Sequence, residues 1–206
     1  MMQLASPHAG RAALSVCLFC GSSDAIGVSY LESAARFGAI LAAEGVRLVY
    51  GGGGIGLMGA AAKAAHDAGG EVLGVIPEFL CRKEVVYDAV ETLVVPNMHD
   101  RKRIMFEQSD AFAIFPGGIG TLEEVIELIS WRRLDLHHKP IVFLDQAGFW
   151  QPLFQLIDHT VSMKVTPDWL TNTWGVASDV DDVLPVIRQM LDQTRGDDPG
   201  DVSIQA

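Results

Sequence analysis

The chain has 206 residues, of which 49 % are hydrophobic and 20 % charged, a composition typical of one globular domain with a sizeable core. Its 26 acidic residues outnumber the 15 basic ones and give a net charge of −11, which argues against binding nucleic-acid polymers or anionic membranes. No apolar run reaches the roughly 18 residues of a membrane span, and three cysteines, an odd and low number, favour a cytoplasmic protein.

The first predicted elements follow a short polar start. Residues 1–13 lack the apolar stretch of a signal peptide, and we expect them to be disordered. A buried strand at 15–21 leads through a turn that contains Ser22 to a helix at about 30–44. Cys17 and Cys20 are three positions apart in this strand, so their side chains point to opposite faces. We therefore expect two buried thiols and not a redox pair.

The rest of the chain alternates between strands and helices. We expect strands at 47–50, 71–76, 91–95, 111–115, 140–145 and 173–177, helices at 57–68, 100–108, 121–134, 149–161 and 179–192, a loop at 78–88, and a disordered tail over 194–206. This alternation predicts an α/β fold, a Rossmann-like doubly wound parallel sheet, in a single domain over 14–193. Ligands of such sheets bind beyond the carboxyl ends of the strands. Four segments converge there, at 21–24, 51–59, 77–84 and 116–124.

Residues 110–124, DAFAIFPGGIGTLEE, read as a buried strand, a glycine turn and a helix start. We expect Thr121 to be the N-cap of that helix. Unpaired N–H groups and the positive end of the helix dipole attract an anion at such a turn. Glu123 and Glu124 either complement the dipole or act on the ligand, and the neighbouring glycine loop favours the second interpretation.

Two further motifs lie at predicted helix starts. Residues 54–59, GIGLMG, match the dinucleotide fingerprint G-x-G-x-x-G. They follow the second strand and not the first, so a nucleotide-phosphate loop is favoured over NAD or FAD binding. In residues 98–103, MHDRKR, we expect Asp100 to be an N-cap and Arg103 to be solvated. Arg101 and Lys102 oppose the helix dipole, which an anionic ligand would explain.

The sequence gives no sign of a metal site or a bound cofactor. The six histidines have no zinc-ligand spacing, and no G-x-S-x-G nucleophile elbow is present. No lysine has the surroundings of a cofactor Schiff base. We therefore expect no metal and no cofactor.

Together, PGGIGTLEE at 116–124, MHDRK at 98–102 and GGGGIGLMG at 51–59 resemble the LONELY GUY (LOG) family. These are cytokinin riboside 5'-monophosphate phosphoribohydrolases, long labelled as possible lysine decarboxylases. The resemblance covers about residues 16–192. It implies a hydrolase that cleaves the N-glycosidic bond of a nucleoside 5'-monophosphate and releases ribose 5-phosphate and an adenine-type base.

The resemblance also implies roles for particular residues. Arg101 and Glu124 would be catalytic, and Glu124 would stabilise the ribose oxocarbenium ion while orienting water. The implied substrate-binding residues are Ser22, Gly53, Gly54, Glu84, Lys102, Gly117, Gly118, Gly120, Thr121 and Glu123. A small-molecule nucleoside monophosphate is the implied partner, together with a second copy of the chain whose helices complete the pocket.

The helix at 121–134 agrees with a homodimer, because it is apolar on more than one face. A buried central helix is the alternative explanation. The alternative functions are a non-catalytic carrier of a phosphorylated cofactor, such as a molybdopterin carrier, a pyridoxal-phosphate lysine decarboxylase, and a dinucleotide oxidoreductase. A carrier would keep the glycine loops but has no need of Arg101 together with Glu124.

Overall fold

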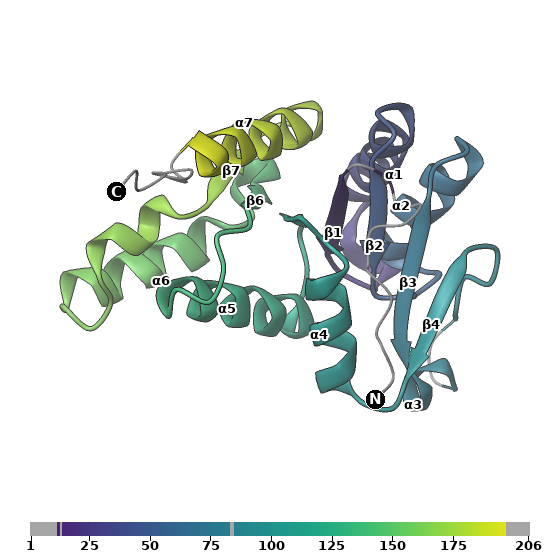
Figure 1. Ribbon diagram of the computed structural model, residues 1–206, viewed down its shortest axis with the longest axis horizontal. Helices are drawn as coiled ribbons and strands as arrows, with labels where there is room; N and C mark the ends of the chain where they lie inside the picture. The colour runs from purple at the N-terminus through teal and green to yellow at the C-terminus, as the bar shows by residue number, and fades with distance from the viewer. Residues whose placement is uncertain (1–11, 13, 83–84, 197–206) are drawn as a thin grey trace, which may run out of the picture.

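The fold is built on one parallel sheet of seven strands, shown in a computed structural model (Figure 1). The structure describes residue 12 and residues 14–82 and 85–196. The strands are β1 (Ser15–Phe19), β2 (Arg47–Tyr50), β3 (Val72–Pro77), β4 (Glu91–Val95), β5 (Ala111–Ile114), β6 (Ile141–Leu144) and β7 (Gly175–Ala177). The α-helices are α1 (Val28–Ala43), α2 (Gly56–Asp67), α3 (Glu78–Cys81), α4 (Met98–Glu107), α5 (Ile119–Arg133), α6 (Gln151–Ser162) and α7 (Val183–Gly196). Short 3-10 turns lie at η1 (Asp24–Ile26), η2 (Gln146–Gly148), η3 (Asp168–Asn172) and η4 (Val180–Asp182).

The sheet is doubly wound around β1. Its strand order is β4-β3-β2-β1-β5-β6-β7, and every adjacent pair is parallel. In this register Val16 of β1 lies opposite Leu48 of β2 on one side and Ala111 of β5 on the other. The winding direction reverses between β1 and β5, and at such a switch point the loops after the strands open a crevice. The predicted fold class is confirmed.

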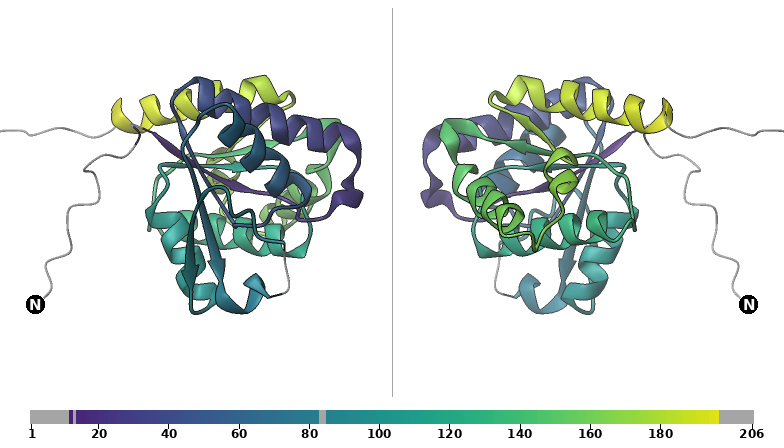
Figure 2. Two further views of the ribbon diagram at one scale, coloured as in Figure 1. Left: turned by 90° about the vertical axis from the view of Figure 1, so that its right-hand side faces the viewer. Right: turned by 90° about the vertical axis from the view of Figure 1, so that its left-hand side faces the viewer.

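Helices cover both faces of the sheet (Figure 2). The core on one face packs α1, α2 and α7 against the sheet, and the core on the other face packs α4, α5 and α6. Cys17 belongs to the second core and Cys20 to the first, both as buried free thiols, so the prediction of opposite faces is confirmed.

Several element boundaries differ from the predictions for local reasons. Helix α1 begins at Val28, two residues early, because Gly27 takes a positive φ of 104° and turns the chain. The one-turn helix α3 occupies part of the predicted loop. Helix α7 continues to Gly196, past the predicted start of the tail at residue 194. The predictions of disorder for 1–11, 13 and 197–206 lie outside the described residues.

Candidate active site

A cavity of about 420 Å³ lies at the carboxyl edge of the sheet, where the predicted segments meet. It is bordered by the ends of β1 and β2, by α3, and by the first turns of α4 and α5. Its lining includes Gly21, Ser22, Gly51, Met58, Phe79, Leu80, Met98, Arg101, Gly118, Ile119, Gly120, Thr121 and Glu124. Residues 30 to 100 positions apart therefore share one pocket, as the switch-point argument requires.

Arg101 and Glu124 form a buried ion pair in this cavity. The side chains are 11 % and 8 % exposed, and Arg101 Nη1 lies 3.3 Å from Glu124 Oε1. Arg101 Nε donates a hydrogen bond to the Val75 carbonyl at 3.2 Å, which fixes the guanidinium against β3. Burial raises the pKa of the Glu124 carboxyl to about 7, and the Arg101 charge opposes that rise. The cavity thus holds a carboxyl group that gains and loses its proton near neutral pH.

Gly51 makes room for the arginine. A Cβ atom at this position would lie 2.2 Å from Arg101 Nη2. Any other residue at Gly51 would push the guanidinium aside, so the absence of a side chain there allows Arg101 to take its position.

The N–H groups of the following loop are engaged within the chain. Gly54 N–H donates to the Val85 carbonyl at 2.6 Å, and Leu57 N–H donates to the Gly21 carbonyl at 3.0 Å. Gly56 N–H donates to Asp24 Oδ1 at 2.7 Å. Gly53 and Gly54 are not among the residues that line the cavity. The loop at 54–57 is therefore held by its own hydrogen bonds, and these three N–H groups are not available as phosphate donors.

The start of α5 borders the cavity and differs from the glycine run. The helix begins at Ile119 with Gly118 as N-cap, and no side chain in the described part of the chain caps it. The prediction that Thr121 is the N-cap is therefore wrong: Gly118 has the extended backbone of a cap, whereas Thr121 lies inside the first turn. The first N–H groups of any helix lack partners within it, and here they border the cavity.

Gly117 lies just behind this turn and is absent from the cavity lining. A Cβ atom there would lie 2.1 Å from Thr121 Oγ1, so its bare backbone lets the threonine side chain fit. Of the four substrate-binding residues expected in this turn, Gly118, Gly120 and Thr121 line the cavity, and Gly117 supports them from behind.

Lys102 and Glu123 do not line the cavity. Lys102 Nζ donates to a carboxylate oxygen of Glu123 and, at 3.0 Å, to Glu127 Oε1. Arg103 is about half exposed and pairs with Glu107 and Asp100 on its own helix, as expected of a solvated cation. Glu84 lies outside the described residues.

The cap of α4 also differs from the prediction. Asn97, and not Asp100, is the N-cap, because its extended backbone lets Asn97 Oδ1 accept the Asp100 N–H at 2.9 Å. Sequence reasoning also missed Met98, Phe79 and Leu80 in the cavity wall. The position of Phe79 just after β3 was the available signal, since residues after parallel strands gather at this edge.

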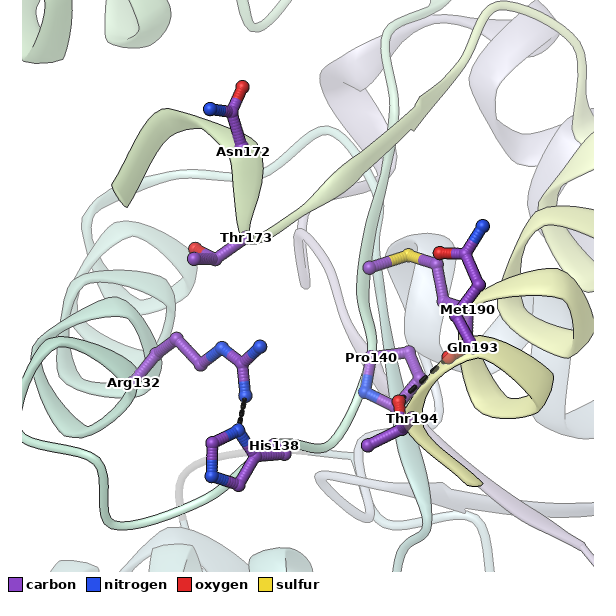
Figure 3. A pocket seen from close by; sticks show the side chains of 8 residues that line it. All are labelled: Arg132, His138, Pro140, Asn172, Thr173, Met190, Gln193 and Thr194. Atoms are coloured by element: carbon purple, nitrogen blue, oxygen red, sulfur yellow. Dashed lines mark hydrogen bonds between the residues drawn. The ribbon is translucent and has the colours of Figure 1, made fainter. Parts of the chain in front are cut away.

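A second cavity, of about 620 Å³, lies at the opposite edge of the sheet, before β6 and β7. Figure 3 shows Arg132 reaching toward His138, with the α7 residues Met190, Gln193 and Thr194 on the far side. Among the residues that the structure describes, its lining contains no carboxylate and no glycine turn. Since ligands of parallel sheets bind at the carboxyl edge, the cavity of Arg101 and Glu124 is the candidate active site. Among the described residues no cluster of acidic, histidine or cysteine side chains fits a metal ion.

Comparison with known proteins agrees with this geometry. The sequence model of a family described as "Possible lysine decarboxylase" matches residues 58–187. The probable cytokinin riboside 5'-monophosphate phosphoribohydrolase LOGL3 of Oryza sativa subsp. japonica is 46 % identical over 146 residues, covering 70 % of this chain and 69 % of that protein. The chain belongs to the LOG family. The resemblance drawn from its three motifs is confirmed.

The match covers only part of a second LOG relative. The cytokinin riboside 5'-monophosphate phosphoribohydrolase LOG of the same rice is 45 % identical over 148 residues, which cover 71 % of this chain but 61 % of the rice protein. Among solved structures, the molybdenum cofactor carrier protein of Chlamydomonas reinhardtii matches with a TM-score of 0.67. That match covers 87 % of this chain and 98 % of the carrier at 24 % identity, which shows a shared fold alone.

None of the described helices combines the length and apolarity needed to cross a membrane.

Proposed function

We propose that the chain hydrolyses the N-glycosidic bond of adenosine 5'-monophosphates, with adenine or an N6-substituted adenine as the base. The buried Arg101–Glu124 pair, beside a helix start with free N–H groups, carries this proposal. The names of the LOG relatives support it, since they describe the same reaction on cytokinin riboside 5'-monophosphates.

The cavity suits each part of such a substrate. The 5'-phosphate binds the N–H groups at Gly118, Gly120 and Thr121. As the bond between the ribose C1' and the base nitrogen breaks, positive charge develops on the ribose, and the ionised Glu124 stabilises it and orients the attacking water. Water supplies hydroxide to C1' and a proton to the leaving base. Arg101 steadies the phosphate or the departing base.

The remaining substrate-binding assignments rest on the family resemblance. Ser22 lines the cavity and is placed to meet the ribose or phosphate. On that resemblance Glu84 is proposed as a direct contact. Lys102, Glu123, Gly53, Gly54 and Gly117 lie outside the cavity lining, so we propose that they serve substrate binding indirectly, by holding the helices and turns that border it. We propose no metal and no cofactor for this hydrolysis.

We also propose that the chain works as a homodimer in the cytoplasm. On α5 the side chains of Val125, Leu128 and Ile129 are buried in the core, which explains part of the apolar surplus. Ile119 remains 82 % exposed and Ile126 43 % exposed. A partner chain would cover these two side chains, of which Ile119 lines the cavity. Buried free thiols agree with a reducing compartment.

Incubation with AMP and with N6-isopentenyladenosine 5'-monophosphate tests the reaction directly. We expect free base from at least one of them, detected by chromatography. The Glu124→Ala variant should lose a factor of about 10²–10³ in kcat, as expected for removing a group that acts on transition-state charge, while still binding the nucleotide. If neither nucleotide releases base and Glu124→Ala binding is intact, the hydrolase proposal fails and a non-catalytic carrier of a phosphorylated cofactor replaces it.

A further inference from the structure

Two consecutive cations of α4 face three carboxylates of α5. Arg101 pairs with Glu124 inside the cavity, and Lys102 pairs with Glu123 and Glu127 just outside it. The Lys102 side chain is only 16 % exposed, although its partners are 51 % and 29 % exposed. The ammonium group is therefore covered and held and does not move freely in solvent.

The two partners of Lys102 are one helical turn apart. Glu123 and Glu127 share a face of α5, as residues i and i+4 do, and Glu124 projects from the neighbouring face into the cavity. A cation that binds both carboxylates fixes the rotation of this part of α5 against α4. The same rotation determines how Glu124 meets Arg101.

We propose that Lys102, bridged to Glu123 and Glu127, is a positioning residue that holds Glu124 against Arg101 and sets the charge around it. The role of Glu127 is to hold Lys102 in this position. The inference rests on the proposed function only in that base release is one of its readouts.

The charged and titratable groups around Glu124 determine the direction in which the pKa of Glu124 should shift in each variant. They are Arg101 and Lys102 from α4, Glu123 and Glu127 from α5, and the Cys17 and Cys20 thiols from β1 and the residue after it. Burial raises the pKa of both thiols, so they stay neutral. Lys102 lowers the pKa of Glu124, whereas Glu123 and Glu127 raise it.

Two variants that disturb the same bridge should therefore act in opposite directions. Lys102→Met removes a cation, so more alkaline pH is needed to ionise Glu124, and the acid limb of kcat/KM moves up by about half a pH unit. Glu127→Gln removes an anion but keeps an oxygen for Lys102, so the limb moves down by a similar amount. The substrate phosphate also titrates, with a pKa near 6, but identically for all variants.

Lys102 also holds Glu124 in position, so replacing Lys102 should lower activity as well as shift the pH dependence. Lys102→Met should lower kcat about tenfold to a hundredfold, the cost of a displaced reacting group, with a smaller change in KM. Lys102→Arg, which can still bridge two carboxylates, should restore most of the rate. The matched control is Arg103→Met on the same helix, because Arg103 pairs on the solvent side with Glu107 and Asp100; it should stay within about twofold of wild type.

Titration of the Glu124 carboxyl carbon by NMR, without substrate, separates this inference from the proposed function. Opposite shifts in Lys102→Met and Glu127→Gln support the positioning role, even if the wild type releases no base. Shifts in the same direction, no shift, or an equal shift in Arg103→Met overturn it, even if the wild type is an active hydrolase.

Discussion

At the scale of single residues, the chemistry of Glu124 comes from where the chain puts it. A carboxyl group that titrates near pH 7 needs burial to raise its pKa and a nearby cation to keep it ionisable. Burial among α4, α5 and β1 supplies the first, and Arg101 supplies the second. Removing either partner would destabilise the fold, because the other charge would stay buried without compensation.

The space at Gly51 is the easiest part of this arrangement to test. In Gly51→Ala the new methyl group would overlap Arg101 Nη2, the far end of a flexible side chain. The guanidinium must move while the backbone stays, so we expect a normal melting temperature and a fall in kcat of about a hundredfold.

Thermal unfolding and base release, measured on the same sample, check this expectation. Gly38→Ala is the contrasting variant: its Cβ would lie 2.1 Å from the Ala61 carbonyl oxygen, where α1 crosses α2. Backbone cannot yield as a side chain can, so this variant should lose about 1–3 kcal/mol of stability. A Gly51→Ala enzyme with full activity would contradict the role given to Gly51.

Some of these residue placements could be read from the sequence and others could not. Strand–glycine–helix spacing was enough to place Thr121 and Glu124 at one helix start. The partners of Lys102 were not predictable, because they depend on the rotation of α4 against α5, which no local pattern encodes. The donors of residues 54–57 were misjudged for a related reason: Asp24 and Val85, which bind them, come from distant segments.

At the scale of elements, α4 is held at both ends. Asn97 caps its N-terminus. At its C-terminal end, Lys139 Nζ donates to the carbonyls of Phe106 at 2.6 Å and Ser109 at 2.7 Å. Phe106 also packs edge-on against Trp131 of α5, with ring centroids 5.1 Å apart. The helix that carries Arg101 is thereby fixed along its length.

Removing the C-terminal anchor should therefore cost stability. Lys139→Met leaves two carbonyls without their charged donor, and we expect a loss of about 2 kcal/mol in the free energy of unfolding. Urea denaturation measures it, with Arg82→Met as control, because the exposed Arg82–Glu78 pair contributes little. Equal unfolding midpoints for the two variants would show that Lys139 does not anchor α4.

Element types followed from hydrophobic periodicity, and the exceptions were short. Helix α3 has four residues, too few for a helical pattern to stand out from a polar loop. The buried strands, such as β5, were predictable because buried parallel strands are continuous apolar runs, as in Phe112 to Ile114.

At the scale of the whole molecule, the exposed apolar side chains of α5 argue for a second copy. Light scattering should give about 44 kDa, twice the 22.2 kDa of the chain. Ile126→Glu places a charge in the proposed contact and should yield monomers with lowered base release, because burying an unpaired charge is unfavourable. Val28→Glu, at the start of α1 on the other face and 69 % exposed, should leave the dimer intact. A dimeric Ile126→Glu protein would move the contact elsewhere.

The position of β1 between β2 and β5 has a consequence for synthesis. Val16 pairs with Ala111, about half the length of the domain away in sequence, and contacts so distant in sequence form late, after local elements have formed. Ser22 and Gly51 are translated long before Arg101 and Glu124, yet the pocket needs all four. A ribosome-bound chain that stops before α5 therefore lacks the proposed active site, which can form only after the two halves of the sheet have joined.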